Sequence, residues 1–417
     1  MPSAITSFKS YTADQIATLS VDQIKSATSA AVKTLTADQI KALSPDQIGA
    51  FGQTDSGYDS GVITAFTDVQ IAAFTPYQAQ FGFTTGQIAT LSTLQLKSLT
   101  SGQLAVMSYD QIDSIRTADI RVLSTAQLKV LSADQIKALE DGAGDQLASA
   151  QIQALTSDQL NALGDFSTAQ ITWLTTKQIQ GLTEDQLRSM STDQVAALTS
   201  TQVQALSTAQ MSSIDILGSQ IAQLTTKQVS SLTTDQLQSV TTTEIAALTA
   251  AQIKSLGTGQ VQSLSEQQLG SLTATQMRSL SNTQLAAFTS SQIAALSAGN
   301  IAALNTSQLQ ALSTTQVRAL TDAQVGALLN GQVSALRTDQ IANPTTDQIG
   351  DLSTSAIAAL TTAQVRAFGS AQLQSLSGDQ LGALTSAQAR ALTADGNGIG
   401  ALTGDRLASL STTAVKA

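Results

Sequence analysis

The chain of 417 residues contains neither Cys nor His, and 20 basic against 30 acidic residues give it a formal net charge of −10. Without Cys and His, the chain cannot form disulfides, zinc fingers, iron–sulfur clusters, cysteine nucleophiles or Ser-His-Asp triads, and haem would have only Met or Tyr as ligands. The acidic balance and the lack of a basic run argue against nucleic-acid binding, which needs a basic face to replace phosphate counterions.

Hydrophobic residues make up 42% of the chain, which is enough for a core, whereas charged residues make up only 12%. Ordinary globular proteins have about 25% charged residues. No stretch approaches the roughly 18–20 consecutive apolar residues of a membrane-spanning helix. We therefore expect a folded chain that does not insert into a membrane.

The first segment, Met1–Tyr11, differs from everything that follows it. It lacks the charged n-region and apolar h-region of a cleaved secretory signal. This permits a cytoplasmic protein, and equally a protein exported by a route that reads an uncleaved signal or supplied in mature form. We treat residues 1–11 as an atypical N-terminal segment.

From Thr12 onward the sequence repeats every eight residues, with the unit S/T-x-x-Q-I/L/V-x-A/S-L. We call this unit an octad and number its positions one to eight; there are about 48 octads. The uninterrupted runs cover residues 12–51, 84–139, 167–214 and 217–392.

Each octad carries its own helix-start signal, as residues 43–48 illustrate. Ser44 at position one is a favoured N-cap, and Gln47 three residues later completes a capping box, in which each side chain satisfies a backbone N–H of the other residue. Leu43 before the cap and Ile48 after the box form a hydrophobic staple. Pro45 stands at the first helical position, where proline is tolerated best.

This unit predicts an all-α solenoid of very short helices, one per octad. Eight residues at 100° each advance 800°, so the apolar stripe of one long helix would drift by about 80° per octad. Strands fit poorly because positions five and eight have opposite parity. Isolated helices below roughly 12 residues are marginal in water, so neighbouring coils must stack. The number of octads in one coil does not follow from the pattern.

The repeat is interrupted at a few places, where Gly and Asp are frequent and favour turns. We expect surface loops or corners between coils there. The interrupted segments are residues 52–58, 75–83, 140–147, 164–166, 215–216 and 393–402.

An alternative interpretation of these interruptions is calcium binding. The Asp-x-Asn spacing at Asp395 and Asn397 resembles the start of a calcium loop. Weaker acidic pairs lie at Asp55 with Asp59 and at Asp141 with Asp145. None of them has the full EF-hand pattern, so calcium is an alternative to a fold without cofactor.

No motif in the chain indicates catalysis. Most Asp residues recur at position three, where they complement the positive end of a helix. Trp173 is the one Trp and occupies position seven, which favours local packing over a ligand platform. Neither a phosphate-binding loop nor a G-x-S-x-G elbow is present. We therefore expect neither enzymatic activity nor a small-molecule substrate.

The octads resemble those of a known family of repeat arrays. The stretch ALTTAQVRAF at residues 359–368 is similar to the octapeptide repeats of large proteobacterial surface proteins that carry the label of adhesins or of haem utilisation or adhesion proteins. The similarity extends over roughly residues 12–410. It implies a surface location and a structural or adhesive role, whereas the absence of His and Cys argues against a role in haem binding.

These observations lead to an expected organisation and function. We expect a continuous octad solenoid at residues 12–402 and terminal repeats at residues 403–417. The expected function is that of an extracellular structural protein, a self-associating subunit of a surface filament or adhesive fibre, exported without a recognisable cleaved signal. The alternative is a monomeric solenoid that binds a protein or peptide partner.

Overall fold

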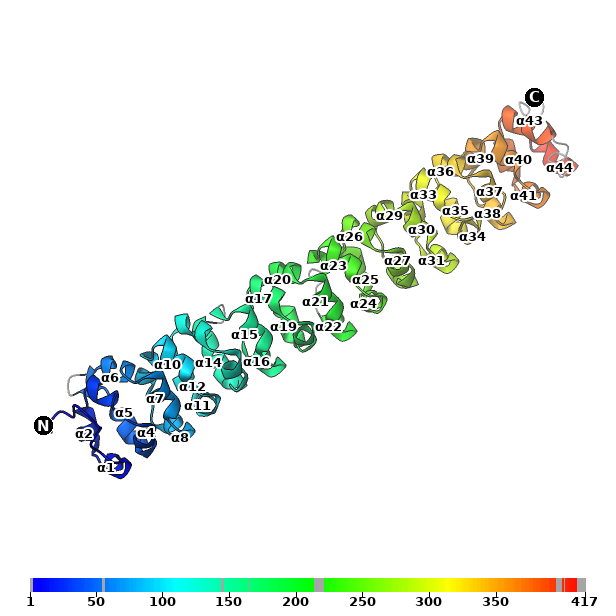
Figure 1. The fold of residues 1–417 in the computed structure, drawn as a ribbon. Coiled ribbons are helices and arrows are strands. Elements are labelled where there is room, and N and C mark those ends of the chain that lie inside the picture. The colour runs from blue at the N-terminus through cyan, green and yellow to red at the C-terminus, as the bar shows by residue number, and fades with distance from the viewer. Residues whose placement is uncertain are drawn as a thin grey trace. The chain divides into compact units, whose positions relative to one another are not determined.

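The computed structural model describes residues 3–54, 57–143, 146–164, 166–213, 221–394, 400 and 402–410. The chain divides into two compact units, Met1–Ala205 and Leu206–Ala417. Each unit is a stack of short helices, with the helices following one another in chain order (Figure 1). The predicted all-α solenoid with one short helix per octad is thereby confirmed.

The first unit contains one small β-hairpin among its helices. Its elements are α1 Ala13–Ala17, α2 Val21–Lys25, α3 Ser29–Val32, α4 Ala37–Ala42, α5 Pro45–Ala50, β1 Gln53–Thr54, β2 Gly57–Tyr58, α6 Ser60–Thr64, α7 Asp68–Ala73, α8 Pro76–Phe81, α9 Thr85–Ala89, α10 Thr93–Ser98, α11 Ser101–Val106, α12 Tyr109–Asp113, the 3₁₀ helix η1 Thr117–Val122, α13 Thr125–Lys129, α14 Ala133–Ala143, α15 Ser149–Ala154, α16 Ser157–Ala162, α17 Thr168–Trp173, α18 Thr176–Gln180, α19 Glu184–Ser189, α20 Thr192–Ala197 and α21 Ser200–Ala205.

The described part of the second unit consists of helices and their connections. Its elements are α22 Thr208–Ser213, the 3₁₀ helix η3 Ile221–Gln223, α23 Thr226–Ser231, α24 Thr234–Ser239, α25 Thr242–Ala247, α26 Ala250–Ser255, α27 Thr258–Ser263, α28 Glu266–Gly270, α29 Ala274–Ser279, α30 Asn282–Ala286, α31 Ser290–Ala295, α32 Ala298–Ala303, α33 Thr306–Ala311, α34 Thr314–Arg318, α35 Asp322–Gly326, α36 Asn330–Ala335, α37 Thr338–Ile341, α38 Thr346–Gly350, α39 Thr354–Ala359, α40 Thr362–Arg366, α41 Ser370–Ser375, α42 Gly378–Gly382, α43 Ser386–Ala394 and α44 Gly404–Ala408.

The predicted capping box is present, and the octad at residues 249–256 shows its geometry. The N–H of Thr249 donates to Gln252 Oε1 at 2.6 Å, and the N–H of Gln252 donates to Thr249 Oγ1 at 3.3 Å. Leu256 and Gly257 then adopt extended conformations, with ψ values of 139° and 162°. Two extended residues between successive helices turn the chain, because they end one hydrogen-bond ladder before the next begins.

Burial follows position in the octad. In the same octad Ile253 and Leu256, at positions five and eight, are buried, and so is Gln252 at position four. Positions one, three and six face solvent. The core is therefore a layer of two aliphatic side chains per octad, and each buried aliphatic contributes about 1.5–3 kcal/mol.

Successive coils stack with a defined periodicity. Helix α26 packs against α23 and α29, which lie three octads before and after it. The side chain of Gln276, at the start of α29, instead reaches the carbonyl groups of Ile245 and Leu248, in the octad four before its own. The start of each octad therefore lies over a junction in the preceding coil. This junction joins the octad that is four before it to the octad that is three before it. One coil consequently contains between three and four octads, a number that the repeat pattern did not reveal.

Helix α14 shows what happens when the capping box is missing. The expectation at residues 140–147 was a loop or corner, but α14 continues through Ala143 and is 11 residues long. Glu140 and Ala143 stand where the pattern has Ser or Thr and Gln. Here the helix continues past position eight, whereas α12 ends at Asp113 although the octad after it also lacks the box. Helix α43, with nine residues, behaves in the same way where Gly396 replaces the Gln of the next octad.

Two other interruptions leave the stacking of octads unchanged. Residues 52–58 include the exposed hairpin of β1 and β2, with Gly52 at a φ of 82°. The ninth residue of the segment 75–83 is accommodated at the end of α8. Gln70 still bonds to the octad four before its own, although the sequence separation rises to 38 residues. The hairpin is therefore a surface addition, as predicted. Residues 75–83, in contrast, form α8 and end in the buried residues Gly82 and Phe83, so the loop or corner expected there is absent.

The interruption at residues 164–166 has a different nature. The side chain of Gln194 donates to the carbonyl of Phe166, and Gln178 donates to those of Ile152 and Leu155. Elsewhere a position-four Gln bonds to the octad four before its own. Gln178 and Gln194 follow this rule only if residues 164–166 are counted as one octad. Phe166 is buried as a position-eight residue would be. The segment is therefore a shortened octad rather than a three-residue addition.

The atypical N-terminal segment takes part in the first coil. Phe8 is fully buried, and the carbonyl groups of Phe8 and Tyr11 accept hydrogen bonds from Gln39 Nε2 at 3.0 and 2.6 Å. Ile5 pairs with Ala27 in an isolated parallel bridge. Residues 4–11 therefore occupy the place of an octad, with Phe8 at position five and Tyr11 at position eight.

Candidate functional site: the glutamine seam between coils

The position-four Gln connects each coil to the one before it. In Gln127 the Oε1 atom accepts the N–H of Ser124 at 2.7 Å, which completes the capping box. The Nε2 atom of the same side chain donates to the carbonyl groups of Leu96 and Leu99 at 3.0 and 2.9 Å. Because the capping box holds Oε1, the amide group can turn only its Nε2 toward the neighbouring coil. We call this row of contacts the glutamine seam.

The seam satisfies backbone carbonyls at helix ends. The last carbonyl groups of a helix have no partner within that helix and need one from elsewhere. Each net hydrogen bond contributes about 1 kcal/mol, and a buried polar group left unpaired costs about 1–3 kcal/mol. Side chains that donate to the position-five and position-eight carbonyls of the preceding coil include Gln47, Gln78, Gln103, Gln135, Gln159, Gln202, Gln268, Gln284, Gln316, Gln340, Gln364 and Gln388.

Arginine replaces the donor where Gln is missing. The octad at residues 116–123 has Asp119 at position four, and an ionised carboxylate cannot donate to a carbonyl. Arg116, at position one, pairs with Asp119 at 2.6 Å and donates from its guanidinium group to the carbonyl of Leu91 at 3.3 Å. Leu91 is the position-eight residue that Gln would contact. The loss of the capping box leaves a 3₁₀ helix, η1, in place of an α-helix.

A second case occurs near the C-terminus. Arg406 stands at position four of its octad and donates to the carbonyl of Leu376. The seam therefore requires a donor that spans the gap between coils, and both Gln and Arg meet this requirement.

Asn300 is too short for the seam. It occupies position four, is 4% exposed, and its Nδ2 atom has no hydrogen-bond partner. The carbonyls four octads earlier that a Gln would reach belong to Leu269 and Leu272. The side chain of Asn has one methylene group fewer than that of Gln, so the amide does not span the gap.

A second, exposed row of contacts runs in the opposite direction. Gln238, Gln262 and Gln310, at position six, donate to position-seven carbonyls three octads later. The corresponding bond from Gln153 ends on the carbonyl of Trp173, a partly exposed residue at the end of α17. The backbone of Trp173 thus takes part in stacking, and local packing of its side chain stays a prediction.

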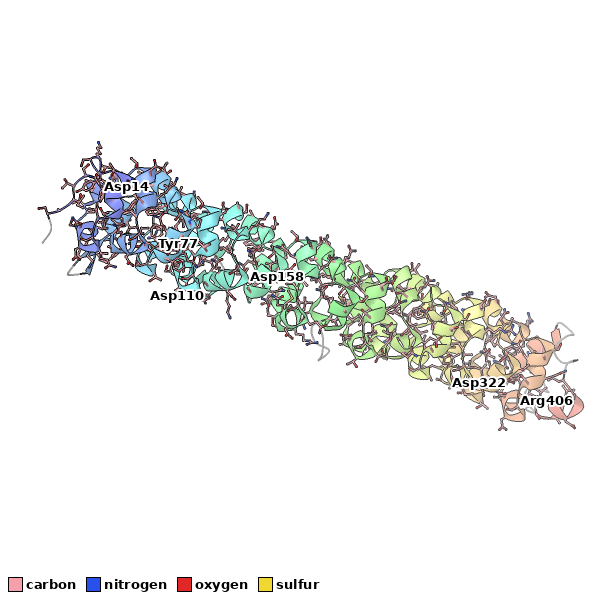
Figure 2. The ribbon with its side chains drawn as sticks, turned by 90° about the horizontal axis from the view of Figure 1, so that it is seen from below. Asp14, Tyr77, Asp110, Asp158, Asp322 and Arg406 are labelled. Carbon is pink, nitrogen blue, oxygen red and sulfur yellow. The ribbon has the colours of Figure 1, made fainter. Side chains whose placement is uncertain are left out.

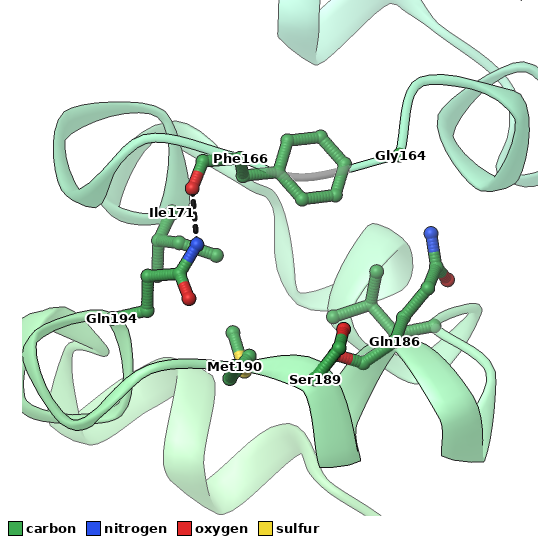
Figure 3. A pocket seen from close by; sticks show the side chains of 8 residues that line it. Gly164, Phe166, Ile171, Gln186, Ser189, Met190 and Gln194 are labelled. Atoms are coloured by element: carbon green, nitrogen blue, oxygen red, sulfur yellow. Dashed lines mark hydrogen bonds between the residues drawn. The ribbon is translucent and has the colours of Figure 1, made fainter.

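Two hollows lie where octads depart from the pattern. The shortened octad leaves a space of about 10 Å³ beside Phe166, Met190 and Gln194, with the Gln194–Phe166 bond on its wall (Figure 3). A second hollow, of about 20 Å³, lies where Pro344 replaces the position-eight Leu. One water molecule needs roughly 10–15 Å³. These spaces are thus packing defects rather than substrate pockets.

Acidic residues outside position four lie mainly on the exterior of the described chain, whereas Asp119 and Glu244, at position four, are buried. Asp14, Asp110 and Asp158, at position three, and Asp322, at position two, are exposed (Figure 2). Desolvation, together with the charge of Asp322 and a hydrogen bond to it, raises the pKa of Asp351 above its ordinary value.

The structure places only some of the calcium candidates. Asp59 is the N-cap of α6, and its Oδ1 accepts the N–H of Gly61 at 2.8 Å. Asp141 belongs to helix α14. Within the described part of the chain, no three acidic side chains are grouped so that they could hold a metal ion. Calcium binding therefore stays a prediction without a described site. The candidates that lie outside the described residues are Asp55, Asp145, Asp395 and Asn397.

One group of exposed residues was missed by the sequence reasoning. Large hydrophobic side chains face solvent in the segment 58–109, with Val69, Tyr77 and Leu94 between 63% and 73% exposed. The rings of Tyr77 and Phe81 lie 4.9 Å apart. The sequence could have indicated this group, because Val69, Tyr77 and Leu94 each stand at position three, where Asp, Thr, Ser or Ala is usual.

The fold and its seam define a class of protein, the helical repeat array in which each coil is bonded to the one before it. Four stretches of the chain, residues 112–142, 184–214, 301–338 and 357–394, match the ALTTAQ repeat family. This confirms the similarity to ALTTxQ-type repeat arrays. No curated protein matches the chain. Among the described helices, none has the length and apolar character to cross a bilayer.

Proposed function

We propose that this protein is an extracellular structural protein without catalytic activity, a subunit of a surface filament or adhesive fibre. The observation that carries the proposal is the direction of the glutamine seam. A regular coil offers amide donors on its N-terminal side and backbone carbonyl acceptors on its C-terminal side. Contacts of this kind between molecules are heterologous, and a heterologous contact that does not close into a ring produces a filament.

The distribution of polar groups supports the structural role. Buried polar side chains at position four are committed to stacking, and the exposed Asp residues serve helix starts. The hollows beside Phe166 and Pro344 hold little more than single water molecules. The similarity to repeat arrays of surface proteins supports a location outside the cell.

Electron microscopy and sedimentation of the purified full chain test the filament proposal. We expect unbranched filaments whose mass grows with protein concentration. Particles of single-chain mass at all concentrations and ionic strengths would contradict the proposal. Protease treatment of intact cells tests the location, because a surface protein is degraded while a cytoplasmic control is protected.

A second candidate function is the binding of a protein or peptide by a monomeric solenoid. It is favoured by the exposed hydrophobic side chains of the segment 58–109, since exposed apolar groups that cluster often mark interaction sites. The test is a pull-down with the wild type and with the V69S/Y77S/L94S variant. The matched control, V130S/L329S, removes exposed apolar side chains that lie outside this segment. One stoichiometric partner that is lost with the first variant and kept by the control would support this function.

A further inference from the structure

Met190 lies at a defect in the stack of coils. It stands at position eight of its octad and lines the hollow that the shortened octad at residues 164–166 leaves. Gln186, Ser189 and Gln194 line the same hollow, and each of them is exposed or half-buried. Figure 3 shows the thioether of Met190 among these residues. The hollow therefore extends to the surface and gives a small dissolved molecule a route to the sulfur atom.

Met107 occupies the same octad position in a regular part of the array. Its exposed fraction is 3%, against 7% for Met190, and Gln135 Nε2 donates to its carbonyl at 2.7 Å. Met277, at position five, is fully buried. Among the methionines that the structure describes, Met190 thus has the largest exposed fraction. Because oxidation of methionine follows access to the sulfur atom, these three side chains should differ in reactivity.

The bond between coils beside Met190 is long. Gln186 Nε2 donates to the carbonyl of Leu160 at 3.4 Å. Ordinary N–H···O bonds measure roughly 2.7–3.2 Å. In the regular octad of Gln135, the two corresponding bonds measure 2.9 and 2.7 Å. The amide of Gln186 is therefore weakly bound to the preceding coil, and it lines the same hollow as the thioether.

We propose that Met190 is an oxidation site, at which hydrogen peroxide converts the thioether to a sulfoxide and thereby loosens the contact between coils at the shortened octad. A lone pair of the sulfur attacks one peroxide oxygen, so that an S–O bond forms and the O–O bond breaks. The leaving hydroxide takes the proton of the transferred oxygen and becomes water. The methionine loses two electrons, and the peroxide gains them.

The sulfoxide changes a position that is apolar in the regular octads. Oxidation turns a flexible apolar side chain into a polar one and disrupts packing in a core. The new oxygen accepts hydrogen bonds, and the amides of Gln186 and Gln194 line the hollow as donors. These amides bind the carbonyls of Leu160 and Phe166 in the preceding coil, so a bond to the sulfoxide removes a bond between coils. This inference does not depend on the proposed filament function.

Peroxide treatment of the full chain, followed by mass spectrometry of its peptides, tests the site. We expect sulfoxide to form about tenfold faster at Met190 than at Met107, and most slowly at Met277, because oxidation follows exposure. In denaturant the three residues should react at similar rates, which separates the effect of the fold from that of the local sequence. Equal rates at Met190 and Met107 in the folded chain would overturn the assignment.

Hydrogen exchange tests the effect of the sulfoxide on the coils. Helices α17 and α20 pack against each other, and Ile171 and Gln194 on them line the hollow. We expect peroxide to speed exchange severalfold in both helices and methionine sulfoxide reductase to restore slow exchange. The variant M190L carries the usual Leu of position eight and should keep slow exchange after peroxide, whereas the matched variant M107L should respond like the wild type. Unchanged exchange in the oxidised wild type, or the same loss of protection in M190L, would overturn the proposed loosening.

Discussion

Two stretches of the molecule share the same apolar spacing and differ in their capping residues. Residues 249–280 carry a box in which Gln accepts the first N–H of each octad, and every helix there ends after five or six residues. In residues 132–147 one box is absent, and α14 runs for 11 residues. Aliphatic residues at positions five and eight therefore set which face is buried, whereas the capping box marks where a new helix starts.

The largest expected effect comes from breaking the seam in the regular stretch. Q276A removes half of a capping box and two bonds to the coil before it, to the carbonyls of Ile245 and Leu248. The expected loss is about 3 kcal/mol, from roughly 1 kcal/mol for each of the three interactions. Hydrogen exchange around α25, α26 and α29 measures it, because solenoid stability depends on nearest neighbours.

The matched control is Q267A, which removes an exposed amide one position away from a seam residue. We expect no measurable change in exchange for this variant. Equal protection in Q276A and Q267A would show that the seam does not hold the coils together.

The missing capping box after α14 can be restored by substitution. E140S/A143Q introduces the Ser and Gln that the octad at residues 140–147 lacks. We expect α14 to end near Leu139, with a net gain of about 1 kcal/mol from the new cap. Backbone chemical shifts across residues 138–143 report the change. The single variant E140S tests the box as a unit, and a helix that still continues through Ala143 in the double variant would contradict the role assigned to the cap.

A smaller gain is expected from lengthening the one short amide of the described seam. N300Q gives the buried amide the reach to the carbonyls of Leu269 and Leu272, and it removes an unpaired Nδ2. The expected increase is about 1–2 kcal/mol in the local free energy of unfolding. Q308N is the reverse change, because Gln308 bonds to Met277 and Leu280 at 3.1 and 2.8 Å. A stabilising effect of both changes would contradict the seam geometry.

The smallest effect concerns pH. Since the folded-state pKa of Asp351 is raised, its protonated form favours folding at low pH, and this contribution is lost as the pH rises through the folded-state pKa. Above that pKa the charge of Asp351 faces that of Asp322 and slightly disfavours the fold. D351N should therefore raise the melting temperature slightly at pH 7 and have no effect at pH 3.

The local unit of this protein follows from its amino-acid sequence alone. The cap, the staple and the two buried positions of each octad are contacts between residues at most a few positions apart, so Thr249, Gln252 and Ile253 contain all the information needed to start α26. Because these contacts are local, the sequence was sufficient to predict one short helix per octad.

The contacts between octads, in contrast, depend on the tertiary structure. The Nε2 atom of Gln276 binds carbonyls 28 and 31 residues earlier, and nothing within an octad specifies that separation. It follows from how far each bend turns the chain, which is a property of stacked coils. For the same reason residues 164–166, an interruption where the sequence predicted a loop or corner, prove to be a shortened octad. The difference is visible only in which carbonyls Gln178 and Gln194 reach.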